Sequence, residues 1–160
     1  MDNSKIWFEF IKDQEHKMRK DVIFVDHCNF QDFKSEINET IDLFNKFINY
    51  PEMWDITDAK DRVDKGHHLF LFRSENKPLG HLWMDTNYIY NLYICNGRDY
   101  VPKDRDKHLS VKLFKHCVNF MGYDQVYGQI DNWNYRSLSF AKRVGAVQVD
   151  EPTNIKTKNY

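Results

Sequence analysis

Apolar residues recur at three- and four-residue steps in several segments of the chain, the spacing of a helix that buries one face. The clearest segment covers residues 31–49, where Phe33, Ile37 and Ile41 share one stripe and Pro51 follows to stop the helix. The same reasoning predicts three further helices, each followed by a glycine, over residues 57–65, 109–121 and 134–144.

Residues 1–20 precede this regular part of the chain as an N-terminal extension, and their pattern fits two structures. Ile6, Phe10 and Met18 stand among charged residues at spacings that suit a helix over residues 4–19. A short strand through Ile6–Ile11 is the competing interpretation, because the same apolar residues also fit a strand. We expect the helix.

Short runs of β-branched and aromatic residues predict strands between these helices. The predicted strands are residues 22–24, 69–73, 80–85, 88–95, 125–130 and 147–149. Residues 74–78 contain polar residues and a proline, so they form a turn that makes residues 69–85 an antiparallel hairpin. The order of elements predicts an α/β (α+β) fold, with a mixed, mostly antiparallel central sheet and helices on both faces.

Length and composition suit one globular domain over residues 1–160, with a flexible tail over residues 152–160. The chain is 41% hydrophobic and 16% aromatic, which excludes a disordered or fibrous protein. Its 23 basic and 24 acidic residues leave a formal net charge of −1. We therefore expect no nucleic-acid partner, since no long-range positive field is present.

Targeting and metal signals are missing from the sequence. No apolar run approaches the roughly 18 residues of a membrane span, and the N-terminus lacks a signal peptide, so we expect a cytoplasmic protein without membrane contact. Cys28, Cys95 and Cys117 should then be reduced, and we interpret them as small buried apolar residues. His67 and His68 would point to opposite faces of a strand, so we expect no metal site.

The junction between the strand at residues 88–95 and the helix at residues 109–121 carries candidate binding chemistry. A polar loop there leads into a helix N-terminus, whose unpaired N–H groups and dipole favour a pyrophosphate. Arg105 and Lys107 would add positive charge, and Ser110 would add a hydroxyl. A solvated loop with charges of both signs is the alternative interpretation.

At this junction the chain resembles the GNAT acetyltransferase superfamily, over roughly residues 55–146. The family's loop begins with Gln or Arg and carries small residues at its fourth and sixth positions. Here Arg105 keeps the basic residue, His108 stands where Gly is usual, and Ser110 is small. The resemblance implies a splayed strand pair beside Ile94 that admits the pantetheine arm of acetyl-coenzyme A.

A second stretch of the chain resembles the family's last helix. Asn134 and Ser137 match positions near the coenzyme arm, while Ala141 replaces a tyrosine that in many members protonates the departing thiolate. Ala146 likewise replaces an aromatic residue. The residues that we expect to bind coenzyme are Leu92, Tyr93, Ile94, Arg105, Lys107, His108, Leu109, Ser110, Asn134 and Ser137.

The resemblance implies an N-acyltransferase that moves acetyl from acetyl-coenzyme A to a primary amine by direct attack, with acyl-coenzyme A as its partner. The alternative is an inactive relative that uses the fold for binding or assembly, which Ala141 and His108 favour. The acceptor cannot be read from the sequence. Aromatic residues in the loops near residues 30–60 and 85–90 fit either an acceptor pocket or a homodimer contact.

Direct transfer requires a neutral amine, so a general base is expected near the sheet centre. His81 is one candidate, because its unperturbed pKa lies near neutrality, and Tyr90 on the next strand is the other. The alternative for both is a residue that packs in the sheet. We interpret Asp85, which precedes a turn, as a turn residue.

Overall fold

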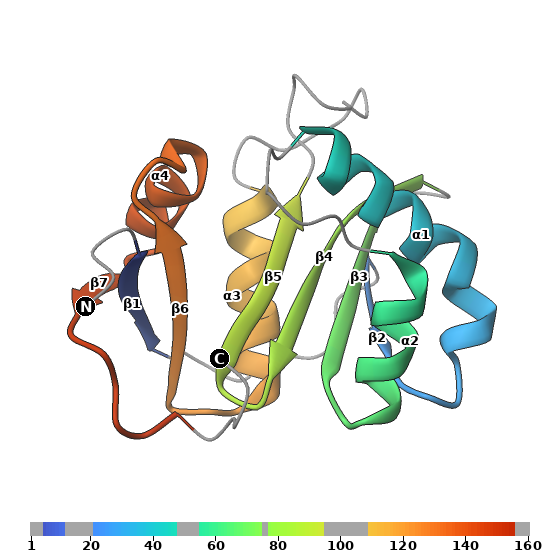
Figure 1. Cartoon of the computed structure of the whole chain (residues 1–160), viewed down its shortest axis with the longest axis horizontal. Helices are drawn as coiled ribbons and strands as arrows, with labels where there is room; N and C mark the ends of the chain where they lie inside the picture. The colour runs from blue at the N-terminus through green and yellow to red at the C-terminus, as the bar shows by residue number, and fades with distance from the viewer. Residues whose placement is uncertain (1–4, 12–20, 48–54, 75–76, 95–108, 156–160) are drawn as a thin grey trace. The chain divides into compact units, whose positions relative to one another are not determined.

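The computed structural model describes residues 5–11, 21–47, 55–74, 77–94 and 109–155 of the chain (Figure 1). The strands among them are β1 Lys5–Ile11, β2 Val22–Val25, β3 His68–Ser74, β4 Lys77–Asp85, β5 Tyr88–Ile94, β6 Gln125–Asp131 and β7 Val147–Val149. The helices are α1 Phe30–Phe47, α2 Ile56–Asp64, α3 Leu109–Met121 and α4 Tyr135–Arg143.

These elements form two compact units, each assembled from separate stretches of the chain. Unit 1 consists of Met1–Met18, Asp85–Tyr90 and His108–Tyr160. Unit 2 consists of Arg19–Met84 and Asn91–Lys107. Strand β5 belongs to both, because its first residues fall in unit 1 and its last in unit 2. The single domain expected over residues 1–160 stays a prediction.

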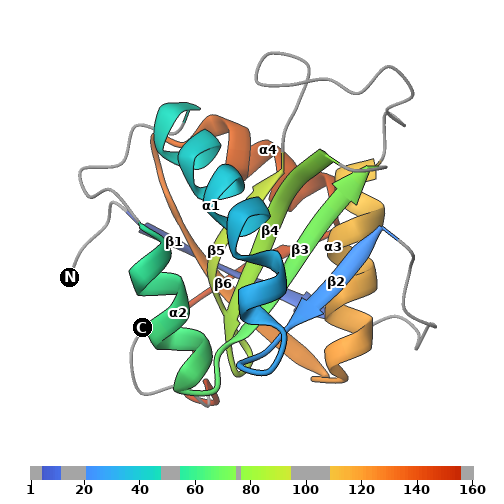
Figure 2. The same ribbon diagram turned by 90° about the vertical axis from the view of Figure 1, so that its right-hand side faces the viewer.

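Unit 2 is built on the antiparallel strands β2, β3 and β4. Strand β3 is buried along its whole apolar run from Leu69 to Phe72, as expected for a strand without polar alternation. Helices α1 and α2 cover one face of β3 and β4 (Figures 1 and 2). On that face His81 of β4 lies against α1, and Trp83 lies under Arg62 of α2.

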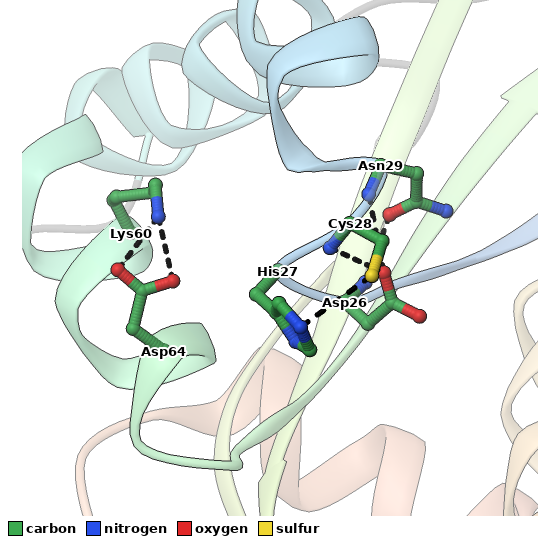
Figure 3. A network of polar contacts seen from close by, with 6 residues as sticks. All are labelled: Asp26, His27, Cys28, Asn29, Lys60 and Asp64. Carbon is green, nitrogen blue, oxygen red and sulfur yellow. Dashed lines mark hydrogen bonds and ion pairs between the residues drawn. The ribbon is translucent and has the colours of Figure 1, made fainter.

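The sequence before α1 forms a reciprocal capping arrangement (Figure 3). Asp26 Oδ1 accepts hydrogen bonds from the backbone N–H groups of Cys28 (2.8 Å) and Asn29 (3.1 Å), and Asn29 Oδ1 accepts one from Asp26 N (2.8 Å). These bonds satisfy backbone donors of the turn that precedes the helix, and α1 begins at Phe30, close to the predicted residue 31.

The expectation that all three cysteines are buried is wrong for Cys28. Its thiol is exposed beside the imidazole of His27, with Sγ 3.4 Å from Nε2, because the capping turn points residue 28 away from the core (Figure 3). Cys117 on α3 is buried, as expected. Cys95 lies outside the described residues.

Unit 1 contains the antiparallel strands β6, β1 and β7, in that order. Every residue of β1 is in register with β6, from Lys5 opposite Asp131 to Ile11 opposite Gln125. The helix expected over residues 4–19 is therefore wrong for residues 5–11, and the competing strand is confirmed. The ladder with β6 satisfies the backbone groups of β1, and Phe10 is buried while its neighbour Ile11 is 64% exposed.

Helices α3 and α4 complete the described part of unit 1. Phe114 of α3 contacts Phe10 of β1 and Phe140 of α4, with ring centroids 4.8 Å and 5.4 Å apart. The helix predicted at residues 109–121 is confirmed with the same bounds, and Gly122 follows it with φ of 75°. The predicted tail begins with ordered contacts, since Asn154 Nδ2 donates to Gln125 Oε1 at 2.8 Å; residues 156–160 lie outside the described residues.

Strand β5 is the neighbour of both β4 and β6, so the hydrogen-bonded order is β2-β3-β4-β5-β6-β1-β7. Within unit 1, β5 and β6 pair in parallel at Tyr88 with Tyr127 and at Ile89 with Gly128. The other registered ladders are antiparallel. The expected mixed, mostly antiparallel α/β fold is confirmed.

Candidate functional site

Part of the predicted coenzyme site falls where the structure gives no description. Arg105, Lys107 and His108 belong to residues 95–108, outside the described residues. Ile94 and Leu109 are placed as the last residue of β5 and the first of α3, without described side chains. The phosphate-binding loop therefore stays a prediction.

The other predicted residues are divided between the two units. His81, Leu92 and Tyr93 belong to unit 2, where the rings of His81 and Tyr93 have centroids 6.2 Å apart. The predicted residues of unit 1 are Tyr90, Ser110, Asn134 and Ser137. Of these, the structure joins Asn134 and Ser137 by a hydrogen bond.

His81 lies at the centre of a buried polar relay in unit 2. Its Nδ1 is 3.0 Å from the hydroxyl of Thr40 on α1, and its Nε2 is 2.6 Å from Oδ1 of Asn91 on β5. The three residues are 3%, 0% and 8% exposed, respectively. A carboxamide oxygen only accepts, so the Nε2–H donates to Asn91, and Nδ1 keeps the lone pair that faces Thr40. The hydroxyl of Thr40 also donates to the carbonyl of Ile37 at 2.9 Å, so its one proton is shared between that carbonyl and Nδ1 of His81.

The relay holds His81 in its neutral form. Burial lowers the pKa of His81 from 6.5 to about 4, and the hydrogen bond with Asn91 opposes the shift only in part. Burial disfavours the charged imidazolium, which would lose its hydration without gaining a carboxylate partner in the relay. An imidazole with this pKa is unprotonated at neutral pH, as a general base must be, but it binds an incoming proton weakly.

Aromatic rings surround the relay in unit 2. Phe44 of α1 packs edge-on against His81 and Tyr93, with centroids 6.2 Å and 6.0 Å apart. The sequence analysis did not select Thr40 or Asn91, although the sequence context of each residue indicates a buried polar group. Thr40 is a polar residue beside the apolar stripe of α1, and Asn91 interrupts an otherwise aromatic and aliphatic strand. A polar residue at an inward position predicts a buried partner.

In unit 1, Asn134 caps helix α4. Its Oδ1 accepts a hydrogen bond from the backbone N–H of Ser137 at 3.2 Å, and the residue is 7% exposed. Ala141 is fully buried at the position where the resemblance expects a tyrosine, and its carbonyl accepts from Ala146 N at 2.9 Å. The methyl group of Ala141 therefore packs inside unit 1 and offers no acid group.

Ser110 occupies the first turn of α3 in unit 1. The residue is 8% exposed. The first turn of a helix favours an anionic ligand, because its backbone N–H groups and its dipole are directed toward the helix start. This is one feature of the described residues that fits the phosphates of a coenzyme.

The other feature that fits is the parallel pairing of β5 with β6 in unit 1. The register between them covers Tyr88 and Ile89, and the residues of β5 from Asn91 onward belong to unit 2. Tyr90, the residue after Ile89, is half-buried. Its assignment as a catalytic residue stays a prediction.

Asp85 closes β4 and precedes a tight connection to β5. Thr86 has φ of 51°, a left-handed conformation that β-branched residues rarely adopt, and its hydroxyl donates to the carbonyl of Asp85 at 2.7 Å. Next to it, Asn87 donates to the carbonyls of Gln125 and Asn154. These contacts agree with the interpretation of Asp85 as a turn residue.

The histidine pair at residues 67 and 68 has a packing role. The indole N–H of Trp83 donates to Nδ1 of His67 at 3.1 Å, which uses that nitrogen within unit 2. No group of three or more candidate metal ligands occurs among the described residues. None of the helices in that same part of the chain is long and apolar enough to cross a membrane.

Comparison with known proteins supports the fold. Neither a family model nor a curated protein matches the sequence. Among solved structures, the chain is similar to an aminoglycoside acetyltransferase from an uncultured soil metagenomic sample, solved in complex with sisomicin. That similarity has a TM-score of 0.58 at 15% identity and covers 85% of this chain and 93% of the other.

Two further solved structures share the fold. One is assigned to the GNAT family and comes from Novosphingobium aromaticivorans, with a TM-score of 0.51 at 10% identity over 91% of this chain and 60% of that chain. The other is an integron cassette protein from the mobile metagenome of V. cholerae, with a TM-score of 0.56 at 15% identity over 88% and 95%. At these identities the likeness establishes a fold of the GNAT type.

Proposed function

We propose that this chain is an acyl-coenzyme A-dependent N-acyltransferase that moves an acetyl group to a primary amine in the cytoplasm. The observation that carries the proposal is the parallel pairing of β5 with β6 at Tyr88 and Ile89, in a chain with the fold of acetyltransferases. Where two such strands part, backbone N–H and C=O groups can bond a ligand in place of a neighbouring strand.

Acetyl-coenzyme A would supply the activated acyl group, and the chain would bind and orient it. The backbone of Leu92, Tyr93 and Ile94 would bond the pantetheine arm, and the start of α3 with Ser110 would face the phosphates. The loop residues Arg105, Lys107 and His108 would add charge to that end. Asn134 and Ser137, at the start of α4, would lie along the arm.

The roles of His81 and Tyr90 follow from their surroundings. Both ring nitrogens of His81 already have partners, so we propose that His81 holds β5 in place through Asn91 and accepts a proton only if the relay opens. Tyr90 is half-buried on the same strand and is the second candidate to exchange a proton with the reacting groups.

Ala141 favours a second candidate function, a protein that binds coenzyme or a partner without catalysis. The buried methyl group leaves no acid at the position where a tyrosine would protonate the departing thiolate. In the enzymatic proposal, water or another side chain must supply that proton. An inactive relative that still binds coenzyme therefore predicts the same coenzyme binding as the enzyme, but no turnover.

Calorimetric titration of the full chain with acetyl-coenzyme A tests the binding step. We expect a dissociation constant in the micromolar range, and we expect Arg105→Ala to raise it about tenfold through the loss of a charge-assisted phosphate contact. Lys34→Ala, which removes an exposed charge from α1, serves as the matched control and should leave the constant unchanged. No heat at millimolar coenzyme would contradict the transferase and favour a protein that uses the fold to bind a partner.

A further inference from the structure

One face of the unit 1 sheet is lined by aromatic and polar side chains. Cross-strand partners share a face, and so do alternate residues along a strand. Phe10 contacts Phe114, so α3 packs on the face of the sheet that carries Phe10. Gly128 and Ile89 share that face, since a Cβ added at Gly128 would contact both Ile89 and Phe10. The remaining face, here called the aromatic face, carries Trp7, Glu9, Tyr88, Tyr127 and Gln129.

Direct contacts within unit 1 hold the aromatic face together. The rings of Trp7 and Tyr88 are tilted at 56° with centroids 6.0 Å apart, and Gln129 Nε2 donates to the hydroxyl of Tyr88 at 3.3 Å. Tyr88 and Tyr127 are buried at 9% and 3% exposure, and the other three residues are half-buried. Pre-positioned rings of this kind lose little entropy when a ligand binds.

Glu9 lies among the aromatic residues of this face, whereas Lys5 and Asp131 oppose each other at the end of the same face. Its cross-strand neighbours are Tyr127 on β6 and Val147 on β7, and no ion pair involves its carboxylate within the described part of the chain. Burial raises the pKa of Tyr127, and the negative charge of Glu9 and a hydrogen bond from the Tyr127 hydroxyl to the Glu9 carboxylate add to that rise. A half-buried carboxylate between aromatic rings gains more from a cation than an exposed one does, because less water screens it.

We infer that the aromatic face binds the cationic end of the amine acceptor, a small organic ammonium ion with an apolar or aromatic body. Glu9 would face the ammonium group, and the rings of Trp7 and Tyr88 would contact both the cation and the body next to it. Charge complementarity selects this occupant over a neutral or anionic molecule. The inference rests on the proposed transferase and names its acceptor class.

The test uses a probe that binds as a cation but cannot accept an acyl group. Phenethyltrimethylammonium fulfils this condition, and 2-phenylethanol is its neutral counterpart with the same aromatic body. Titration of the full chain followed by ¹H–¹⁵N spectra reports on the indole N–H of Trp7, identified with Trp7→Phe, and on the side-chain amide of Gln129. No coenzyme is present, so failure of the transferase proposal cannot affect the result.

We expect the ammonium probe to shift both signals and to bind about fivefold more tightly than the alcohol. Glu9→Gln, which keeps the shape of the side chain, should remove that preference, whereas Glu151→Gln, an exposed change in the same unit, should keep it. Equal binding of the two probes, or an unchanged preference in Glu9→Gln, would overturn the inference. Binding of the ammonium probe without shifts at Trp7 and Gln129 would overturn it as well.

Discussion

Two polar arrangements in this protein differ in how completely their groups are paired. In unit 2, the His81 relay is buried and each ring nitrogen has a partner. In unit 1, the aromatic face is partly exposed and its carboxylate, Glu9, has no cationic partner among the described residues. A buried group whose partners are all within the protein stabilises the fold, because any change leaves a partner unsatisfied, whereas a half-exposed carboxylate without a cationic partner can bind a cation from a ligand.

The largest expected effect concerns the apolar core of unit 2. Leu82 on β4 is 0% exposed, so Leu82→Ala should lower the free energy of unfolding by about 3 kcal/mol through lost burial and a residual cavity. Val147→Ala, at a residue 58% exposed on β7 of unit 1, should change it by less than about 0.5 kcal/mol. Urea unfolding measures both, and equal losses would contradict the burial assigned to the two positions.

The next effect is the pH dependence of unit 2 stability. The pKa of His81 is about 4 in the folded protein and 6.5 in the unfolded chain, so the unfolded state binds this proton more tightly. The stability contributed by neutral His81 is complete above pH 6.5 and is lost as pH falls toward 4, by up to about 3 kcal/mol. His81→Gln should flatten the urea-unfolding free energy over this range.

The exposed His27 provides the control for this pH measurement. His27→Gln changes a histidine outside the relay, and the slope of stability against pH should persist in that variant. A slope that survives in His81→Gln would show that another group produces it. In that case His81 would not be the buried neutral residue that the relay requires.

A smaller effect on stability is expected at Asn134, and it distinguishes the role of this residue as a helix cap from its proposed role in coenzyme binding. Asn134→Ala should destabilise the protein by about 1 kcal/mol because Ser137 N loses its acceptor, and Asn134→Asp should restore most of that loss. Thermal unfolding measures the cap, and calorimetry with acetyl-coenzyme A measures the ligand. If Asn134 also contacts the coenzyme, Asn134→Asp will weaken coenzyme binding although its stability is nearly normal. Unchanged coenzyme binding in Asn134→Asp would show that Asn134 only caps α4.

The smallest expected effect on stability belongs to Glu9. Glu9→Gln should change the free energy of unfolding by less than about 0.5 kcal/mol, because no ion pair among the described residues is lost. The same variant should lose its preference for the ammonium probe. A large loss of stability in urea unfolding would show that Glu9 stabilises the fold, as the His81 relay does. The two arrangements would then not differ in the way proposed above.

The sequence predicted most elements because local patterns determined them. Helix α3 has the predicted bounds, since its apolar spacing ends at Gly122 and only the glycine readily adopts φ of 75° there. Strand β1 was predicted wrongly, because the positions of Ile6 and Phe10 fit both periods. The choice depends on pairing with β6, more than a hundred residues away, which no local pattern contains.

The candidate sites were less predictable for the same physical reason. His81 was selected for its titration range, but its burial against Thr40 and Asn91 depends on how α1 meets β4. The aromatic face combines residues of β1, β5 and β6, so the sequence separates what the sheet brings together. The motif residues Arg105 and Lys107 lie outside the described part of the chain.

Turnover with a primary amine tests the central claim most directly. Acetyl-coenzyme A and phenethylamine are incubated with the full chain, and thiol release is followed together with the mass of the amine. We predict stoichiometric release of coenzyme A and N-acetylphenethylamine, with the rate reduced in Glu9→Gln. Coenzyme that binds without thiol release, for phenethylamine and for other primary amines alike, would contradict the transferase and favour the binding protein.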